Sequence, residues 1–133
     1  MRTYIPRNTK YRLDKQRYLE LKAFARQYKA WKTAANDLYG LQAVKSGTIR
    51  SSDPSDPTER AAEALEKYKT KIDMVEKAAK ASSFYCWEHI LLNVTEGLSY
   101  EMLAKQGRKP PCGVNQFYEA RQRFYWELDK IKD

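Results

Sequence analysis

The feature that most constrains this sequence is one long amphipathic stretch between about residues 57 and 81. Its apolar side chains recur in alternating steps of four and three residues, the period of one face of an α-helix, at Ala61, Leu65, Tyr68, Ile72, Val75 and Ala79. Asp56, Pro57 and Glu59 precede the stretch in the order of N-cap, first helical position and capping-box acid. The stripe predicts a long helix that either packs on the chain's own N-terminal helices or forms a short coiled coil with a second copy.

The N-terminal third also has helical spacing. Residues 1–12 combine cations and tyrosines with Pro6 and Asn8, which predicts an extended arm. From Asp14, a candidate N-cap, apolar side chains recur at helical spacing through Tyr28, and a second helical pattern continues from Trp31 to Leu41. The pattern leaves open whether the two form one helix or bend near residues 28–30.

The C-terminal part predicts three more helices. Ser82 or Ser83 is expected to cap a helix over about residues 84–95 that stops at Gly97. Ser99 is expected to cap residues 100–106, and a turn over 107–113 leads into a helix over 114–131. Their inner faces supply a predicted core of Trp87, Ile90, Val94, Met102, Leu103, Phe117, Phe124 and Leu128. With no strand pattern anywhere, the expected fold is an all-α helical bundle with a C-terminal helix-turn-helix-like three-helix unit.

The chain then divides into a basic arm with helices (1–45), a loop (46–57), the amphipathic helix (58–81) and the helix-turn-helix-like unit (82–133). The formal net charge of +8 is unevenly spread along these parts. Residues 1–50 hold 12 basic and 3 acidic side chains, whereas residues 51–98 hold 6 and 9. A basic N-terminal third indicates a polyanion-binding surface, although it is also compatible with a solvated face that serves solubility alone.

The last helix carries the candidate recognition residues. Its outward side chains near the N-terminus are of types whose hydrogen-bonding groups suit base edges in the major groove, and the candidates for base readout are Asn115, Gln116, Glu119, Gln122 and Arg123. Cations elsewhere are candidates for contacts with the DNA backbone, namely Arg2, Arg7, Lys10, Arg12, Lys15, Arg17, Lys105, Arg108 and Lys109.

Enzymatic and metal-binding classes are disfavoured. Cys86, Cys112 and the single His89 are too few for a disulfide scaffold or a cysteine- or histidine-based zinc site, so no metal, cofactor or catalytic residue is expected. Cys86 is expected to be buried, and Cys112, in a basic turn, is the more reactive candidate. The 10 tyrosines are expected mainly in the core, with stacking on single-stranded bases as the alternative.

Several segments resemble proteins encoded in prophages of Gram-positive bacteria. They are residues 97–103, 111–113 and 117–125, with residues 11–18 and 28–32 resembling the N-terminal halves of those proteins. The chain is similar to the ArpU/RinA-like late-gene regulators, whose C-terminal domain is similar to region four of sigma factors. This resemblance implies a small phage transcription regulator that binds duplex DNA, with 99–106 as its first helix and 114–130 as its recognition helix. The turn over residues 108–111 departs from the pattern.

We therefore expect a non-enzymatic, DNA-binding transcription regulator, a monomer or homodimer, in the cytoplasm of a bacterial host. No segment has the apolar length of a membrane span or the apolar core of a signal peptide, so no membrane partner is expected. Double-stranded DNA is the expected partner, with host RNA polymerase or another host protein as a further candidate. One alternative is an inhibitor or adaptor of a host nucleic-acid-binding protein, such as a nuclease, which uses the acidic strip Glu59, Glu63, Glu66, Asp73 and Glu76. Another is the small DNA-recognition subunit of a phage packaging motor.

Overall fold

The computed structural model describes residues 11–45 and 57–133, and these ranges contain six α-helices and no strand. The helices are α1 (Lys15–Arg26), α2 (Tyr28–Lys45), α3 (Pro57–Ser82), α4 (Trp87–Glu96), α5 (Tyr100–Lys105) and α6 (Val114–Ile131). The predicted all-α fold is thus confirmed. Asp56, with most of the predicted loop and most of the predicted arm, lies outside the described residues.

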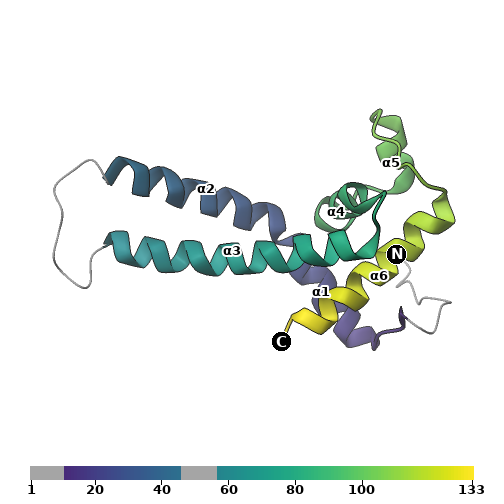
Figure 1. The fold of residues 1–133 in the computed structure, drawn as a ribbon, viewed down its shortest axis with the longest axis horizontal. Helices are drawn as coiled ribbons and strands as arrows, with labels where there is room; N and C mark the ends of the chain where they lie inside the picture. The colour runs from purple at the N-terminus through teal and green to yellow at the C-terminus, as the bar shows by residue number, and fades with distance from the viewer. Residues whose placement is uncertain (1–10, 46–56) are drawn as a thin grey trace.

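Two helices form a long antiparallel hairpin. In Figure 1, α2 and α3 run side by side, while α1, α4, α5 and α6 gather at the end where α2 begins and α3 finishes. Near this end α3 packs against both α4 and α6. The side chains of α3 that are buried include Leu65, Ile72, Val75 and Ala79, which belong to the predicted stripe. The stripe is therefore covered by the chain's own helices, and a coiled coil with a second copy is not needed to bury it.

The two N-terminal helices meet at a break. Asp14 caps α1, because its carboxylate accepts a hydrogen bond of 3.1 Å from the backbone N–H of Gln16. Helix α1 ends at Arg26 with Gln27 as its C-cap, and α2 starts at Tyr28. Leu21 and Ala25 turn inward from α1. The apolar pattern left open whether this region forms one helix or two, and the structure shows two helices separated at Gln27.

Helix α4 begins later than the sequence predicts, and the expected cap is wrong. Ser82 is buried in the last turn of α3, where its hydroxyl donates a 2.6 Å hydrogen bond to the carbonyl of Ala79. The Ser83 hydroxyl accepts from the backbone N–H of Cys86 at 3.0 Å and so stabilises a turn. Both serines are occupied by local backbone groups, which leaves Phe84 in a turn, outside the helix that was expected to contain it.

Gly97 ends α4 as predicted. Its φ of 76° lies in the left-handed region, and its backbone N–H bonds the carbonyl of Asn93 at 2.9 Å. A Cβ at this position would lie 2.7 Å from the Arg26 guanidinium of α1. The positive φ is what favours glycine here, because the atoms closest to such a Cβ belong to the end of the flexible Arg26 side chain, which can move aside.

Helix α5 is capped as predicted but faces differently. The Ser99 hydroxyl accepts from the backbone N–H of Met102 at 3.1 Å. Tyr100 and Leu103, three residues apart, are its buried side chains, whereas Met102 is 51% exposed. The predicted inward position of Met102 is wrong, because a helix of six residues packs only one narrow side and Leu103 occupies it.

Helix α6 completes the core. The Gln116 side-chain oxygen accepts from the backbone N–H of Gly113 at 3.1 Å and so fixes the start of the helix. The rest of the predicted core is confirmed, with Trp87 only half-buried: Ile90 and Val94 of α4, Leu103 of α5 and Phe117, Phe124 and Leu128 of α6. Within the described ranges, no helix is both long and apolar enough to cross a membrane.

Candidate nucleic-acid interface

The N-terminal half of α6 presents polar side chains to solvent. Asn115, Gln116, Glu119 and Arg123 are exposed, as predicted. Gln122 is only 7% exposed, so its predicted role in base readout is wrong. It lies four residues after Tyr118 and three before Tyr125, and the helical period therefore turns it toward this packed flank rather than toward solvent.

The N-terminal part of the chain packs on the other half of α6. The Tyr18 and Tyr125 rings lie 5.0 Å apart, and the Tyr11 and Trp126 rings lie 5.4 Å apart, both edge to face. These contacts place α1 along the second half of α6. The exposed side chains between residues 115 and 123 are consequently not covered by α1.

Arg17 belongs to this contact, and its predicted role at the DNA backbone is wrong. Its Nε donates to a carboxylate oxygen of Asp129 at 2.6 Å, and its Nη2 donates to the carbonyl of Lys132 at 2.6 Å. Its Nη1 also bonds Glu20 at 3.1 Å. The hydrogen bond with Asp129, followed by that with Glu20, raises the pKa of Arg17. The guanidinium thus covers the C-terminal carbonyls of α6, where cations are favourable, and has no donor group aimed at a phosphate.

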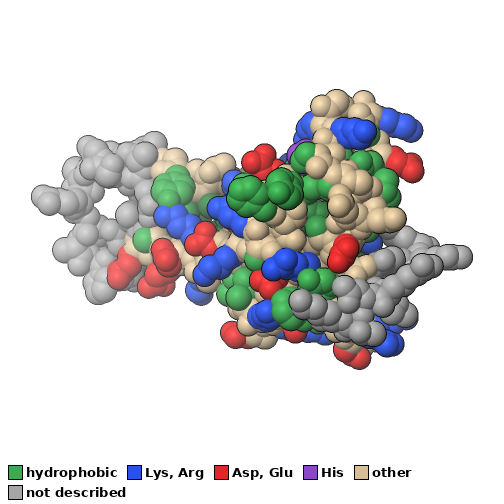
Figure 2. All heavy atoms as spheres, turned by 45° about the vertical axis from the view of Figure 1, so that its right-hand side comes forward, with side chains coloured by type: hydrophobic (Ala, Val, Ile, Leu, Met, Phe, Trp, Pro, Cys, Tyr) green, Lys and Arg blue, Asp and Glu red, His purple; other side chains and the backbone are tan. Residues whose placement is uncertain are grey.

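The remaining predicted cations divide into two sets. Arg2, Arg7 and Lys10 lie outside the described residues. Arg12, just before α1, and Lys15, its first residue, are exposed. Lys105, Arg108 and Lys109 are exposed at the end of α5 and in the turn that follows. Figure 2 shows Lys and Arg side chains gathered over α5, at the top of the view.

The turn between α5 and α6 is held firmly although its surface is charged. Pro110 is fully buried, and the Tyr100 hydroxyl donates to the carbonyl of Cys112 at 2.7 Å. The Tyr118 hydroxyl accepts from the backbone N–H of Tyr100 at 3.3 Å. These contacts tie α5, the turn and α6 together, so that Lys109 is carried at a fixed place near the start of α6.

Arginines 121 and 123 of α6 differ in their surroundings. Arg121 is half-buried, and its guanidinium lies 4.7 Å from the centre of the Tyr118 ring. Arg123 is exposed. The two side chains have the same charge on the same helix, and Arg121 therefore offers a matched control for Arg123.

A cavity of about 400 Å³ adjoins the exposed face of α6. Gln116, Glu119 and Arg123 line it from α6, and Tyr85 lines it from the turn between α3 and α4. Tyr11 also lines the cavity. Polar groups of α6 and aromatic rings from two other segments therefore line one open cavity.

Both cysteines also line this cavity, and neither is a reactive thiol. Cys86 is buried, and burial, together with a hydrogen bond to the Cys86 side chain, raises the pKa of Cys112 to about 12. The thiol of Cys112 therefore stays protonated at neutral pH, against the expectation that it is the more reactive one. In the described part of the chain, no group of three or more His, Cys, Asp or Glu side chains is placed to hold a metal ion.

Most tyrosines pack in the core, as predicted, but sequence reasoning missed an aromatic pair on the surface. Phe84 and Tyr85 are 86% and 76% exposed, with their rings 5.4 Å apart. The helical pattern assigned both to α4, and only their position directly after two capping-type serines signals a turn.

The acidic strip on α3 is not a uniform surface. Glu76 accepts a 2.5 Å hydrogen bond from the Tyr28 hydroxyl, and Lys32 lies 3.9 Å from the same carboxylate. Lys67 and Lys77 lie among the exposed acids of the helix. One of the five predicted acids is therefore occupied within the chain, and the others are interleaved with cations.

Comparisons of the chain with protein-family models, curated proteins and solved structures find no match.

Proposed function

We propose that this protein is a non-enzymatic DNA-binding regulator of phage or prophage origin, which acts in a bacterial host cell. In this proposal α4, α5 and α6 work as a helix-turn-helix unit, as in the ArpU/RinA-like regulators that the sequence resembles. The N-terminal half of α6 enters the major groove of duplex DNA, and cations beside it hold the phosphates.

The observation that carries the proposal is the exposure of the polar side chains in the first half of α6. Asn115, Gln116 and Arg123 carry amide and guanidinium groups that can form paired hydrogen bonds with base edges. These side chains start at the first turn of a helix, where free backbone N–H groups also favour phosphates. A face of this kind supports base readout better than a uniformly charged face would.

The second support is the group of exposed cations beside the start of α6. Lys105, Arg108 and Lys109 lie on α5 and on the turn that leads into α6. Contacts with phosphates fix the register of a protein on DNA without reading its sequence. With Arg12 and Lys15, five of the predicted backbone cations are described and exposed.

A salt titration with random duplex DNA tests the electrostatic part. If each of these five cations neutralises one phosphate, the slope of log affinity against log salt is about −4.5. The double variant Arg108→Ala/Lys109→Ala should make the slope shallower by about 1.8. Its matched control, Lys67→Ala/Lys77→Ala on α3, removes the same charge and should leave the slope unchanged.

Selection of random duplex sequences on the purified protein tests the readout. An enriched motif is expected, and Arg123→Ala should relax one position of it at a cost of about 1–3 kcal/mol. Arg121→Ala should leave the motif in place, because Arg121 is stacked on Tyr118.

Absence of duplex binding at low salt would overturn the proposal. Co-purification of one host protein in that case would favour an adaptor, and a ring of many copies in light scattering would favour a packaging subunit.

A further inference from the structure

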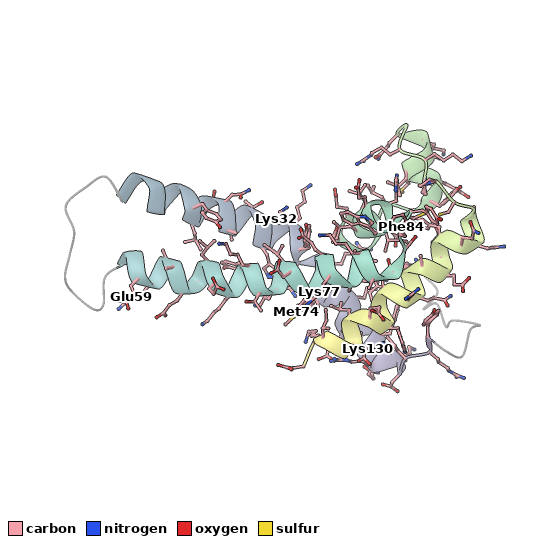
Figure 3. The ribbon with its side chains drawn as sticks, viewed as in Figure 1. Lys32, Glu59, Met74, Lys77, Phe84 and Lys130 are labelled. Carbon is pink, nitrogen blue, oxygen red and sulfur yellow. The ribbon has the colours of Figure 1, made fainter. Side chains whose placement is uncertain are left out.

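The pair of aromatic side chains at the turn between α3 and α4 has no role in the core. Phe84 and Tyr85 leave most of their ring surface in water, although exposing large aromatic rings forgoes the free energy of burying them. Figure 3 labels Phe84 where α3 gives way to α4. Tyr85 lines the cavity beside α6, so one ring of the pair belongs to a concave site and not to a flat surface.

Three side chains of α6 that line the same cavity offer directional hydrogen bonds. The Gln116 amide has its Nε2 as a donor, while its Oε1 already accepts from Gly113; Glu119 has an accepting carboxylate, and Arg123 has a donating guanidinium. The volume of about 400 Å³ falls in the range of small-molecule sites. An aromatic ring together with hydrogen-bond donors and acceptors in one cavity lining matches a flat heterocycle that has both on its edge, and a nucleobase is such a ring.

Exposed cations come within two residues of cavity-lining residues at two places along the chain. Arg12 directly follows Tyr11, and Lys109 comes two residues before Pro111, which also lines the cavity. Both cations are exposed. Aromatic rings for the bases and cations for the backbone are the combination with which proteins hold unpaired nucleotides.

We infer that this cavity takes a nucleobase that has left the stack, held against Tyr85 and bonded at its edge by Gln116, Glu119 or Arg123. The inference rests on the proposed function, because both place DNA on α6. It adds that this protein favours DNA in which one base is unpaired. In a fully paired duplex the base must first be unstacked and unpaired, which costs free energy, whereas in a bulged duplex the base is already unpaired.

The experiment compares two labelled duplexes of the same sequence by fluorescence anisotropy, one fully paired and one with a single bulged thymine. The wild-type protein should bind the bulged duplex about tenfold more tightly, in line with the stacking of one base on an aromatic ring. Tyr85→Ala should remove this preference and leave the affinity for the paired duplex within about twofold, whereas Tyr85→Trp should keep the preference.

Tyr39→Ala is the matched control, since Tyr39 is an exposed tyrosine, 47% accessible, on α2 and not among the residues that line the cavity. It should leave the preference intact. Equal binding of both duplexes, or a preference that survives Tyr85→Ala, overturns the inference while the proposed function stands. Failure of both duplexes to bind overturns both.

Discussion

The placement of α5 is tested by truncating two neighbouring side chains, because the sequence pattern predicts both as buried and the structure buries one. Leu103 is 0% exposed, whereas Met102 is half in solvent. The two variants Leu103→Ala and Met102→Ala should therefore differ strongly in stability, although they change adjacent residues of one short helix.

The size of the difference follows from the burial. Leu103→Ala removes three buried carbon groups, worth about 2.4 kcal/mol of transfer free energy, and the cavity left behind brings the loss to about 3–5 kcal/mol. Met102→Ala removes a side chain that is already half solvated, and alanine is a good helix former, so its loss should stay under about 1 kcal/mol.

Urea unfolding followed by far-UV circular dichroism measures both losses, with equal m values as the check that the variants unfold in the same way. Equal losses, or a larger loss for Met102→Ala, would mean that α5 is rotated about its axis relative to this structure. The turn that carries Arg108 and Lys109 would then lie elsewhere, and the candidate interface would have to be rebuilt.

Three further predictions concern single groups. Ser99→Ala removes the hydroxyl that accepts from the Met102 N–H and should cost about 1 kcal/mol in urea unfolding, whereas Ser99→Asp should restore most of it. Burial raises the pKa of Tyr125 above its ordinary value of 10, so the unfolded chain loses this proton at a lower pH than the folded one. The free energy of unfolding should therefore fall as pH rises above 10, by up to about 1.4 kcal/mol per pH unit, and Tyr125→Phe should reduce that slope; an unchanged slope would contradict the burial of the phenol. Iodoacetamide should alkylate Cys112 far more slowly at pH 8 than it alkylates the same residue in urea, because burial and the Cys86 side chain keep the thiol protonated; equal rates would show that Cys112 is open to solvent.

The parts of the fold that the sequence predicts correctly are those that depend on interactions between residues close together in the chain. The caps at Asp14 and Ser99 and the stop at Gly97 depend on backbone groups within four residues, so residue type and spacing suffice to find them. The stripe of α3 is likewise a property of one helix. Its period predicts which side is buried, but not whether the covering helix belongs to the same chain.

The sequence-based predictions are wrong where a side chain binds a partner far away in the sequence, or a local backbone group other than the one expected. Arg17 is of a residue type that commonly contacts phosphates, but its actual partner, Asp129, lies 112 residues further along the chain. Ser83 is of a residue type that commonly caps helices, but its hydroxyl stabilises the turn before α4 instead. Gln122 sits at the border between two faces of α6, where neighbouring tyrosines determine its exposure. The spacing of residue types along the sequence does not show which of these alternative partners a side chain will have.

The long helix α3 has consequences for how the molecule opens. Its most deeply buried side chains, Val75, Ala78 and Ala79, lie toward its C-terminal end, and Leu65 is the buried side chain nearest its other end among those described. Amide hydrogens along this one helix should therefore exchange with deuterium in a graded order, fastest near Pro57 and slowest near Ala79. The hairpin can fray at its tip and re-form while α6 and its neighbours stay assembled.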